Sequence, residues 1–489
     1  MLSKEQELQT NVARAAKWST ITEFALKLVL PVTNMVLARL LTPAAFGIVA
    51  TVMIVVSFAD IFTDAGFQKY LVQHEFCDEK DREESSNTAF WTNLVFSLFV
   101  WLVIALFRDN IASLVGSDGY GHVIAVSGVL VVLISVSGIL SALLRRDFDF
   151  KTLFYVRIVG AFVPFVVTIP LAFFTKSFWA LIIGNIVTNA ITLVLLIWKG
   201  KFIPKLRFKL SKLREMLSFS VWTMFEAVSI WLTSYIGTFI VGRTLSEHHT
   251  GVYKTSVSTV NSYMSLITAS TTPVLFSALS RLQDDNDRFE KTYLDFQRVV
   301  ALFVLPMGAG IYLYRELVTS ILLGSQWADA SHFIGLWGLT SAFTIVFSNY
   351  NSEVFRSKGK PKLSLLVQIL HLVVLVPALV VASKYGFETL YVTRSLVRFQ
   401  MIAVSLIVLR VCFGIRITKI IANTAPLLCA TAVMSIVSVV INDVFNGIVW
   451  QFVCIAICIA VYFAAVMLFP KPRKEIFGLI NKYALRRKM

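Results

Sequence analysis

The chain has 489 residues, of which 57% are hydrophobic and 15% are charged, and its mean hydropathy is +0.74. An ordinary soluble domain has about 25% charged residues, so this composition excludes a soluble enzyme, a secreted disulfide scaffold and a disordered chain. The net charge of +16 would suit nucleic acid in a soluble protein, but the cytoplasmic loops of membrane proteins also collect Lys and Arg. We therefore predict an integral membrane protein, in contact with membrane lipids and without a nucleic-acid partner.

Fourteen runs of the chain are long and apolar enough to cross the hydrocarbon as helices, which takes about 20 residues. In chain order they cover residues 18–38, 40–59, 89–107, 120–144, 154–174, 177–198, 217–241, 255–280, 293–313, 331–352, 363–383, 389–409, 420–442 and 444–470. The stretch 316–330 is too polar to span and is predicted to form a short interfacial helix. The polar N-terminus lacks the features of a signal peptide, so the first span is predicted to be retained. The fold class predicted is an all-α membrane protein with 14 transmembrane helices.

The loops between these spans alternate in charge. With the N-terminus placed inside, one set of loops holds 33 Lys and Arg residues and the other holds 6. Because cytoplasmic loops are the basic ones, both termini are predicted to be cytoplasmic. The densest basic loop, KGKFIPKLRFKLSKLRE at 199–215, is interpreted as a topological anchor, with a contact to anionic lipid or a cytoplasmic partner as the alternative.

An internal repeat appears when the chain is shifted on itself by 204 residues. The shift aligns spans one and two with spans seven and eight without a gap, and it pairs Trp18 with Trp222, Arg39 with Arg243, Gly47 with Gly251 and Thr51 with Thr255. The repeats begin six spans apart, so both have the same orientation and should pack about an axis along the membrane normal. A cavity between two such lobes is the expected substrate site.

The repeat and the basic loop together predict the domain organisation. It consists of an N-terminal six-helix lobe at 1–198, a basic cytoplasmic linker at 199–215, a C-terminal six-helix lobe at 216–412, and two extra helices with a basic tail at 413–489.

Four segments resemble a known group of exporters. They are LARLLTPAAFGIVA at 37–50, FADIFTDAGFQKYLVQ at 58–73, NTAFWTN at 87–93 and LLRRDFDFKTL at 143–153. With the span count, they make the chain similar to the polysaccharide-transporter (Wzx-type flippase) branch of the multidrug/oligosaccharidyl-lipid/polysaccharide exporter superfamily. The resemblance implies that two lobes, by alternating access, flip an undecaprenyl-diphosphate-linked oligosaccharide across the bacterial cytoplasmic membrane for exopolysaccharide or O-antigen-type synthesis. It also makes other polysaccharide-assembly proteins candidate partners.

Cations inside the spans are the candidate substrate-binding residues. An ionisable group at mid-membrane costs about 2.5–3.5 kcal/mol, so several such cations should face a wet cavity. Six lie in spans or at their edges: Lys27, Arg157, Lys254, Arg298, Arg394 and Arg398. Arg394 and Arg398 are one helical turn apart and share a face, whereas Arg298 is interpreted as snorkelling. The other five are predicted to bind the diphosphate, which needs such cations.

Four carboxylates are candidates for ion coupling or gating. Glu23 and Glu226 are one residue apart under the repeat offset, and either is a candidate carrier of a coupling proton or sodium ion. Glu23 and Lys27 are also one turn apart, so mutual neutralisation is the alternative. Asp60 and Asp64 end span two, where they are interpreted as gate salt bridges or, alternatively, as solvated charges at a loop end.

The chain carries no sign of catalysis. It contains no GxxxxGK[ST], HExxH or CxxC motif, so no ATPase activity, metal or cofactor is predicted. His371 is interpreted as a satisfied buried imidazole. The transport alternative is an ion-coupled multidrug antiporter, which would need acidic cavity residues to bind cations. The enzyme alternative is a membrane polysaccharide polymerase or ligase, for which the family resemblance leads us to expect a large external loop.

Overall fold

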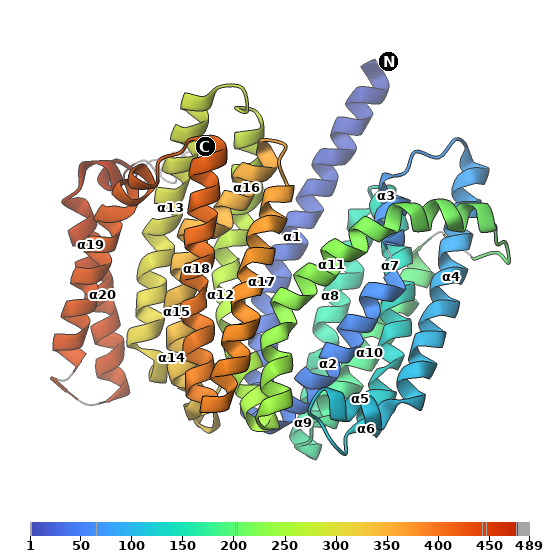
Figure 1. Ribbon diagram of the computed structural model, residues 1–489, viewed down its shortest axis with the longest axis horizontal. Helices are drawn as coiled ribbons and strands as arrows, with labels where there is room; N and C mark the ends of the chain where they lie inside the picture. Colours follow the sequence, from blue (N-terminus) through green and yellow to red (C-terminus); the bar gives the residue numbers. More distant parts are fainter. Residues whose placement is uncertain are drawn as a thin grey trace. The chain divides into compact units, whose positions relative to one another are not determined.

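The protein is described by a computed structural model of residues 2–64, 66–200, 202, 204–442, 444–445, 447–475 and 477. Within these ranges the chain is helical and contains no strand, which confirms the all-α fold class. The chain forms two compact units, Met1–Lys254 and Thr255–Met489 (Figure 1).

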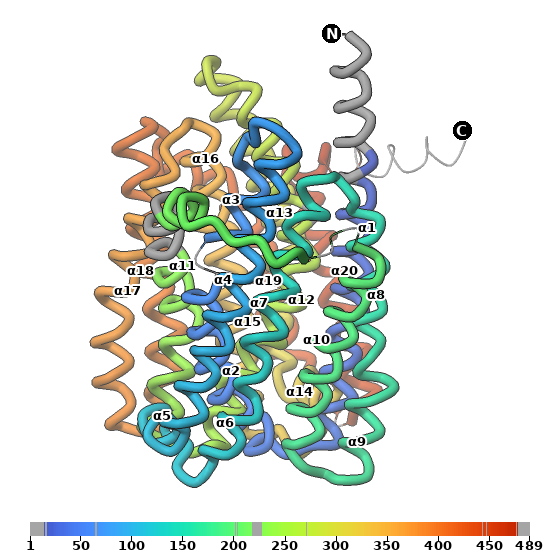
Figure 2. Tube along the Cα trace, turned by 90° about the vertical axis from the view of Figure 1, so that its right-hand side faces the viewer, coloured from blue at the N-terminus to red at the C-terminus, as the bar shows by residue number. Residues whose placement is uncertain are grey.

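The first unit contains α1 to α11 and the beginning of α12. The helices are α1 (Leu2–Leu40), α2 (Pro43–Asp64), α3 (Phe67–Gln73), α4 (Glu79–Leu106), α5 (Arg108–Leu114), α6 (Gly121–Ser127), α7 (Val129–Arg146), α8 (Phe150–Val166), α9 (Thr168–Thr175), α10 (Trp179–Lys199), α11 (Leu210–Thr244) and α12 (Glu247–Ser280). Helix α7 packs against α2, α3, α4 and α10, and Figure 2 shows α2, α4 and α7 running side by side. Asp78 caps α4 by accepting a hydrogen bond from the backbone N–H of Asp81, and Asp149 caps α8 in the same way.

The second unit contains the rest of α12 and the elements that follow it. These are α13 (Asn286–Leu313), α14 (Arg315–Leu322), η1 (Ser325–Ala330), α15 (Ser331–Thr344), η2 (Ile345–Asn349), α16 (Tyr350–Ser357), α17 (Lys362–Ala382), η3 (Ser383–Tyr385), α18 (Phe387–Phe413), α19 (Ile417–Asn442) and α20 (Ile448–Met467). A π-helical turn, η2, joins α15 to α16, and the side-chain amide of Gln297 donates to the carbonyl of Val346 in that turn at 3.1 Å. The predicted interfacial stretch forms the short helices α14 and η1.

Twelve helical segments of the described chain are long and apolar enough to cross a membrane, so the protein is a multi-pass membrane protein. Ten of the fourteen predicted runs are matched one to one within residues 17–199 and 286–413, and the last two match α19 and α20. The remaining two runs lie in α11 and α12, which are 35 and 34 residues long but more polar. The total of fourteen stays a prediction.

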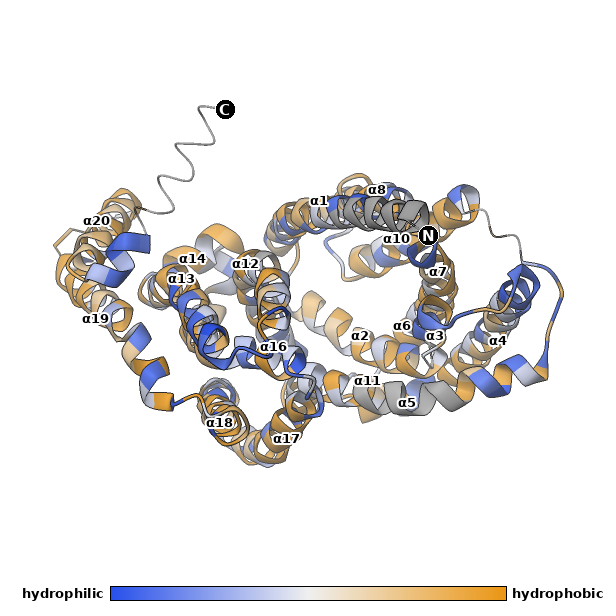
Figure 3. Ribbon diagram, turned by 90° about the horizontal axis from the view of Figure 1, so that it is seen from above, coloured by the Kyte–Doolittle hydropathy of each residue, from blue (hydrophilic) through white to orange (hydrophobic). Residues whose placement is uncertain are grey.

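Exposed apolar side chains cover the outer faces of several helices. On α19, Ile436 and Val440 are 65% and 66% exposed, and on α20, Phe452 and Ile459 are each 53% exposed. Figure 3 shows both helices mainly in the colour of hydrophobic residues. Such faces are stable in contact with lipid and would be unfavourable in water.

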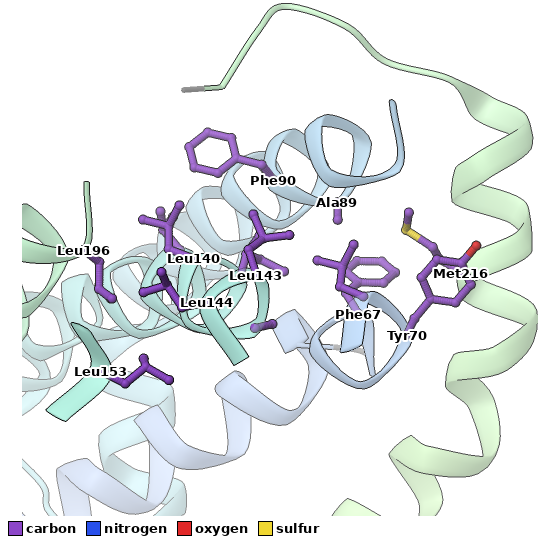
Figure 4. Packing of buried hydrophobic residues seen from close by; sticks show 14 of the residues in the cluster. Phe67, Tyr70, Ala89, Phe90, Leu140, Leu143, Leu144, Leu153, Leu196 and Met216 are labelled. Atoms are coloured by element: carbon purple, nitrogen blue, oxygen red, sulfur yellow. The ribbon is translucent and has the colours of Figure 1, made fainter. Parts of the chain in front are cut away.

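A buried cluster ties the start of α11 to the first unit. Phe67 and Tyr70 of α3, Leu143 of α7 and Met216 of α11 are all at most 5% exposed and belong to one hydrophobic core (Figure 4). Since α11 also packs against α2 and α4, the boundary between the compact units falls after Lys254. The lobes at 1–198 and 216–412 are therefore not the units defined by contacts, and they remain a prediction from the repeat.

The basic loop docks onto the acidic beginning of α4. Three ion pairs, each 2.6 Å long, join Lys205 to Glu83, Lys209 to Glu84 and Lys212 to Asp81. The indole N–H of Trp91 also donates to the carbonyl of Lys205 at 2.8 Å. These Lys side chains therefore have carboxylate partners within the protein, and the role of the loop as a topological anchor stays a prediction.

Candidate substrate-binding site

Glu23 of α1 and Arg157 of α8 form an ion pair in the first unit. The Arg157 Nη1 atom lies 3.0 Å from the Glu23 Oε1 atom, and the two side chains are 44% and 52% exposed. Trp18 precedes Glu23 by five residues and Phe154 precedes Arg157 by three, and the centres of their rings are 5.0 Å apart, so apolar packing positions the two helices. Lys27 lies one turn further along α1 and is half-buried. The pairing of Glu23 with Arg157 was not anticipated, because the sequence suggested only the local pair with Lys27.

Lys254 lies two turns inside α12, because that helix begins at Glu247. Its Nζ atom is 4.5 Å from the centre of the Tyr235 ring, within the range of a cation–π contact. In the described part of the chain, no hydrogen bond or ion pair engages this ammonium group. Lys254 is therefore a half-buried cation held against an aromatic ring of the same unit.

Arg398 of α18 is held in the second unit by stacking and hydrogen bonding. Its guanidinium carbon lies 3.9 Å from the centre of the Trp337 ring, and its Nη1 atom donates to the hydroxyl of Ser341 at 2.6 Å. The Trp337 indole N–H in turn donates to the side-chain oxygen of Asn261 at 3.2 Å. The ring and the hydroxyl fix the plane of a guanidinium that has five N–H donors.

Arg394 lies beside the same ring, one turn before Arg398. Its guanidinium carbon is 5.2 Å from the centre of the Trp337 ring, which confirms that the two arginines share a face. Its Nη1 atom is 3.5 Å from Nε2 of His371. His371 is 2% exposed, and its Nδ1 atom lies 3.1 Å from Oε1 of Gln400, as expected for a satisfied buried imidazole.

Trp337 and Ser341 were missed by the sequence argument. Both lie on α15, a helix without Asp, Glu, Lys or Arg, so a search for charged residues passes over them. The available signal was their spacing of one helical turn, together with neighbouring hydroxyl residues at Thr340 and Thr344. Such a polar stripe inside an apolar span indicates a buried polar partner.

Arg298 is a structural residue. It is 8% exposed, and its guanidinium donates to Glu475 at 2.8 Å and to Asp295 at 2.7 Å, as well as to the side chain of Asn423. The guanidinium thus joins α13 to α19 and to the segment that follows α20. Snorkelling alone was an incomplete interpretation, because the charge is neutralised inside the protein.

Of the other three acidic candidates, the structure describes the side chain of Asp60 alone. Asp60 is half-buried near the end of α2. The side chains of Asp64 and Glu226 lie outside the described residues.

The five candidate cations fall into two groups, with Lys27, Arg157 and Lys254 in the first unit and the two arginines of α18 in the second. Both groups offer N–H donors suited to an anion such as phosphate.

The chain is similar to several proteins of polysaccharide synthesis. It is 25% identical over 344 residues to the succinoglycan biosynthesis transport protein ExoT of Rhizobium meliloti, covering 69% of this chain and 68% of that protein. It is 21% identical over 383 residues to the lipopolysaccharide biosynthesis protein WzxC of Escherichia coli, covering 77% and 76%.

The fold is shared with a solved flippase. The lipid II flippase MurJ, in an inward closed conformation, matches with a TM-score of 0.72 at 14% identity, covering 92% of this chain and 98% of that chain. An inward-facing multidrug transporter of the MATE family has a TM-score of 0.60 and covers 80% and 94%. The family described as "Polysaccharide biosynthesis protein" matches residues 36–332, more than half of the sequence. The chain therefore belongs to the polysaccharide biosynthesis protein family.

Proposed function

We propose that the protein flips a polyprenyl-diphosphate-linked oligosaccharide repeat unit across the bacterial cytoplasmic membrane, for the synthesis of an exopolysaccharide or O-antigen-type polysaccharide. Membership in the family, the transport and biosynthesis names of the relatives, and the fold shared with a lipid II flippase support this proposal. The observation that carries it is the pair of arginines, Arg394 and Arg398, held over the Trp337 ring inside a membrane-spanning helix. Cations are rare inside membrane spans and mark substrate pathways, and a diphosphate is an anion that two neighbouring guanidinium groups can bind.

The proposal gives each cation a role. Arg398, fixed by Trp337 and Ser341, would bind phosphate oxygens bidentately, and Arg394 would neutralise the second phosphate. Lys254, Lys27 and Arg157 would supply further positive charge from the first unit. Alternating access of two lobes would then expose the bound head group first to one side of the membrane and then to the other.

The membrane potential supplies a driving force. Moving one elementary charge across 100 mV is worth about 2.3 kcal/mol, so a diphosphate with two negative charges gains about 4.6 kcal/mol on moving outward. Cations that moved with the head group would cancel part of that gain. Glu23, Glu226, Asp60 and Asp64 remain candidates for ion coupling or gating, and both termini are proposed to be cytoplasmic. Other polysaccharide-assembly proteins remain proposed partners.

Two alternatives are less well supported. A multidrug antiporter for cations would need acidic residues in its binding site, whereas Arg394 and Arg398 meet at one ring. A polymerase or ligase would need catalytic groups, and the relatives ExoT and MurJ are named as a transport protein and a flippase.

Transport in proteoliposomes tests the proposal. A fluorescent undecaprenyl-diphosphate saccharide should be flipped by the wild-type protein, and an inside-negative potential set with valinomycin should accelerate outward movement. The triple variant Arg394→Gln, Arg398→Gln, Lys254→Gln should lose transport at normal membrane abundance. Transport by the triple variant at the wild-type rate would show that these cations are structural, and export of cationic drugs alone would favour the antiporter.

A further inference from the structure

An apolar groove of about 640 Å³ lies within the first unit, between α2, α4, α5 and α11. We propose that this groove holds the hydrocarbon chain of the polyprenyl diphosphate substrate, with the diphosphate near Lys254. The proposal rests on the proposed function and adds to it the site of the lipid chain.

The groove is lined by aliphatic and aromatic side chains, which suit a hydrocarbon chain. Among the described residues, no charged side chain lines it, and its walls include Phe58, Phe62, Phe99, Val103, Leu114 and Trp231. Phe58, Phe99 and Leu114 are 41%, 58% and 60% exposed, so the groove opens at the surface of the unit. The single polar group of Trp231, its indole N–H, donates to the hydroxyl of Ser57 at 2.9 Å. The Trp231 ring therefore meets the groove as an apolar surface.

A row of aromatic rings connects the groove to Lys254. The ring centres of Phe62 and Phe58 are 5.0 Å apart, and those of Phe58 and Trp231 are 4.8 Å apart. Trp231 stacks on Tyr235 with ring centres 5.6 Å apart and planes 23° apart. The ammonium of Lys254 lies 4.5 Å from the centre of the Tyr235 ring. Hydrocarbon-binding walls thus lead to a cation that has no ion pair within the described chain.

This arrangement selects the occupant by charge as well as by shape. An apolar groove alone would accept any acyl chain from the bilayer. A groove that leads to a half-buried ammonium favours a chain with an anionic head, since a unit pair at 4 Å gains about 4 kcal/mol at an effective dielectric constant of 20. The flat, methyl-branched isoprene units of a polyprenyl chain also present faces that can pack against aromatic rings.

Substitutions at two valines of α4 distinguish binding in the groove from binding to the exposed apolar surface elsewhere on the helix. Val103 lines the groove, whereas Val95, two turns earlier on the same helix, is 63% exposed and lies outside it. Binding of undecaprenyl diphosphate and of farnesyl diphosphate, which has a much shorter chain, is measured on the purified full-length protein in nanodiscs. Val103→Trp should weaken undecaprenyl diphosphate about tenfold, because a few methylene groups lose their burial, and should weaken farnesyl diphosphate less, because its shorter chain buries less surface in the groove. Val95→Trp should change neither, and Lys254→Gln should weaken both lipids.

Each result bears on a different claim. Wild-type affinity of Val103→Trp for undecaprenyl diphosphate, or equal weakening of both lipids, would overturn the groove assignment. If Val103→Trp lowers the melting temperature, Val103→Phe repeats the comparison with a smaller intrusion into the groove. Failure of the wild-type protein to bind either diphosphate would instead refute the proposed function, which the groove variants do not test.

Discussion

Gly47 of α2 and Gly251 of α12 lie against each other without room for a β-carbon on either residue. A β-carbon on Gly47 would overlap the carbonyl oxygen of Glu247, and one on Gly251 would overlap the carbonyl oxygen of Pro43. Glu247 follows Pro43 by 204 residues, the same offset that relates Gly251 to Gly47. The internal repeat therefore corresponds to a symmetric helix crossing within the first unit, where small residues permit close approach.

Alanine at this crossing should destabilise the protein. Gly47→Ala and Gly251→Ala should each cost about 1–3 kcal/mol, because the added methyl group must push the backbone of the facing helix away. The measurement is thermal unfolding in detergent. Gly310→Ala is the matched control, since no atom lies within 4 Å of a β-carbon built there. Equal melting temperatures for Gly47→Ala and Gly310→Ala would show that the crossing can relax.

Arg398 should be needed for transport in a way that Lys cannot fully replace. Arg398→Gln is expected to reduce export severalfold or more, because it removes a cation held by Trp337 and Ser341. Arg398→Lys should be milder but still impaired, since an ammonium lacks the planar fork of donors. Arg410→Gln, at the exposed end of the same helix, should export normally. Indistinguishable rates for Arg398→Gln and Arg410→Gln at equal membrane abundance would contradict the role given to Arg398.

The pair formed by Glu23 and Arg157 should appear as coupling in a double-mutant cycle. The pair is about half exposed, and such pairs in water contribute about 0.2–1 kcal/mol. Glu23→Gln and Arg157→Gln should therefore have small effects on unfolding, and the double variant should cost less than their sum. Strict additivity of the three unfolding free energies would show that the two charges do not interact in solution.

The buried contact between Arg298 and Glu475 should stabilise the segment after α20. Arg298→Met should cost about 3–5 kcal/mol, because Glu475, with 18% side-chain exposure, is left without this partner. The double variant Arg298→Met, Glu475→Gln should recover part of that loss, since it also removes the stranded charge. Limited proteolysis of the C-terminal segment and thermal unfolding measure both effects. Equal stability of the single variant and the wild-type protein would argue against the contact.

Docking of the basic loop should weaken in acid. The Tyr70 hydroxyl donates to Glu215 at 2.8 Å and, together with Lys212, lowers the pKa of the Glu215 carboxyl. A carboxyl whose pKa is lowered by folding stabilises the folded state at pH values above its pKa in the unfolded chain, which is about 4.3 for Glu. This contribution disappears as the pH falls through the lower pKa of the folded state.

Thermal unfolding as a function of pH checks this expectation. At pH near 7 the melting temperature of the wild-type protein should be higher than that of Glu215→Gln. The melting temperatures of the two proteins should become equal below about pH 4. Glu75→Gln alters an exposed carboxylate close by and should follow the wild-type curve. A constant difference between wild type and Glu215→Gln at all pH values would mean that the effect of the substitution is not electrostatic.

Most of the helices and the class of protein could be predicted from the amino-acid sequence. Apolar runs of sufficient length predict membrane helices because the hydrocarbon demands internal backbone hydrogen bonding, and this is a local property of the chain. The shared face of Arg394 and Arg398 was likewise predictable, since helix geometry fixes it. The repeat offset also predicts that Gly47 and Gly251 occupy related positions, and the two residues are in contact.

Which side chains far apart in the sequence contact each other depends on the packing of the helices. Glu23 pairs with Arg157, 134 residues away, and Arg298 with Glu475, 177 residues away. The ring that Arg398 contacts, Trp337, belongs to α15, a helix without Asp, Glu, Lys or Arg. No local pattern encodes such partners, because a charge in a helix pairs with whichever group the packing of other helices brings within about 4 Å. The helices are thus set by local hydrophobicity, whereas the environment of each buried charge is set by the packing of helices far apart in the chain.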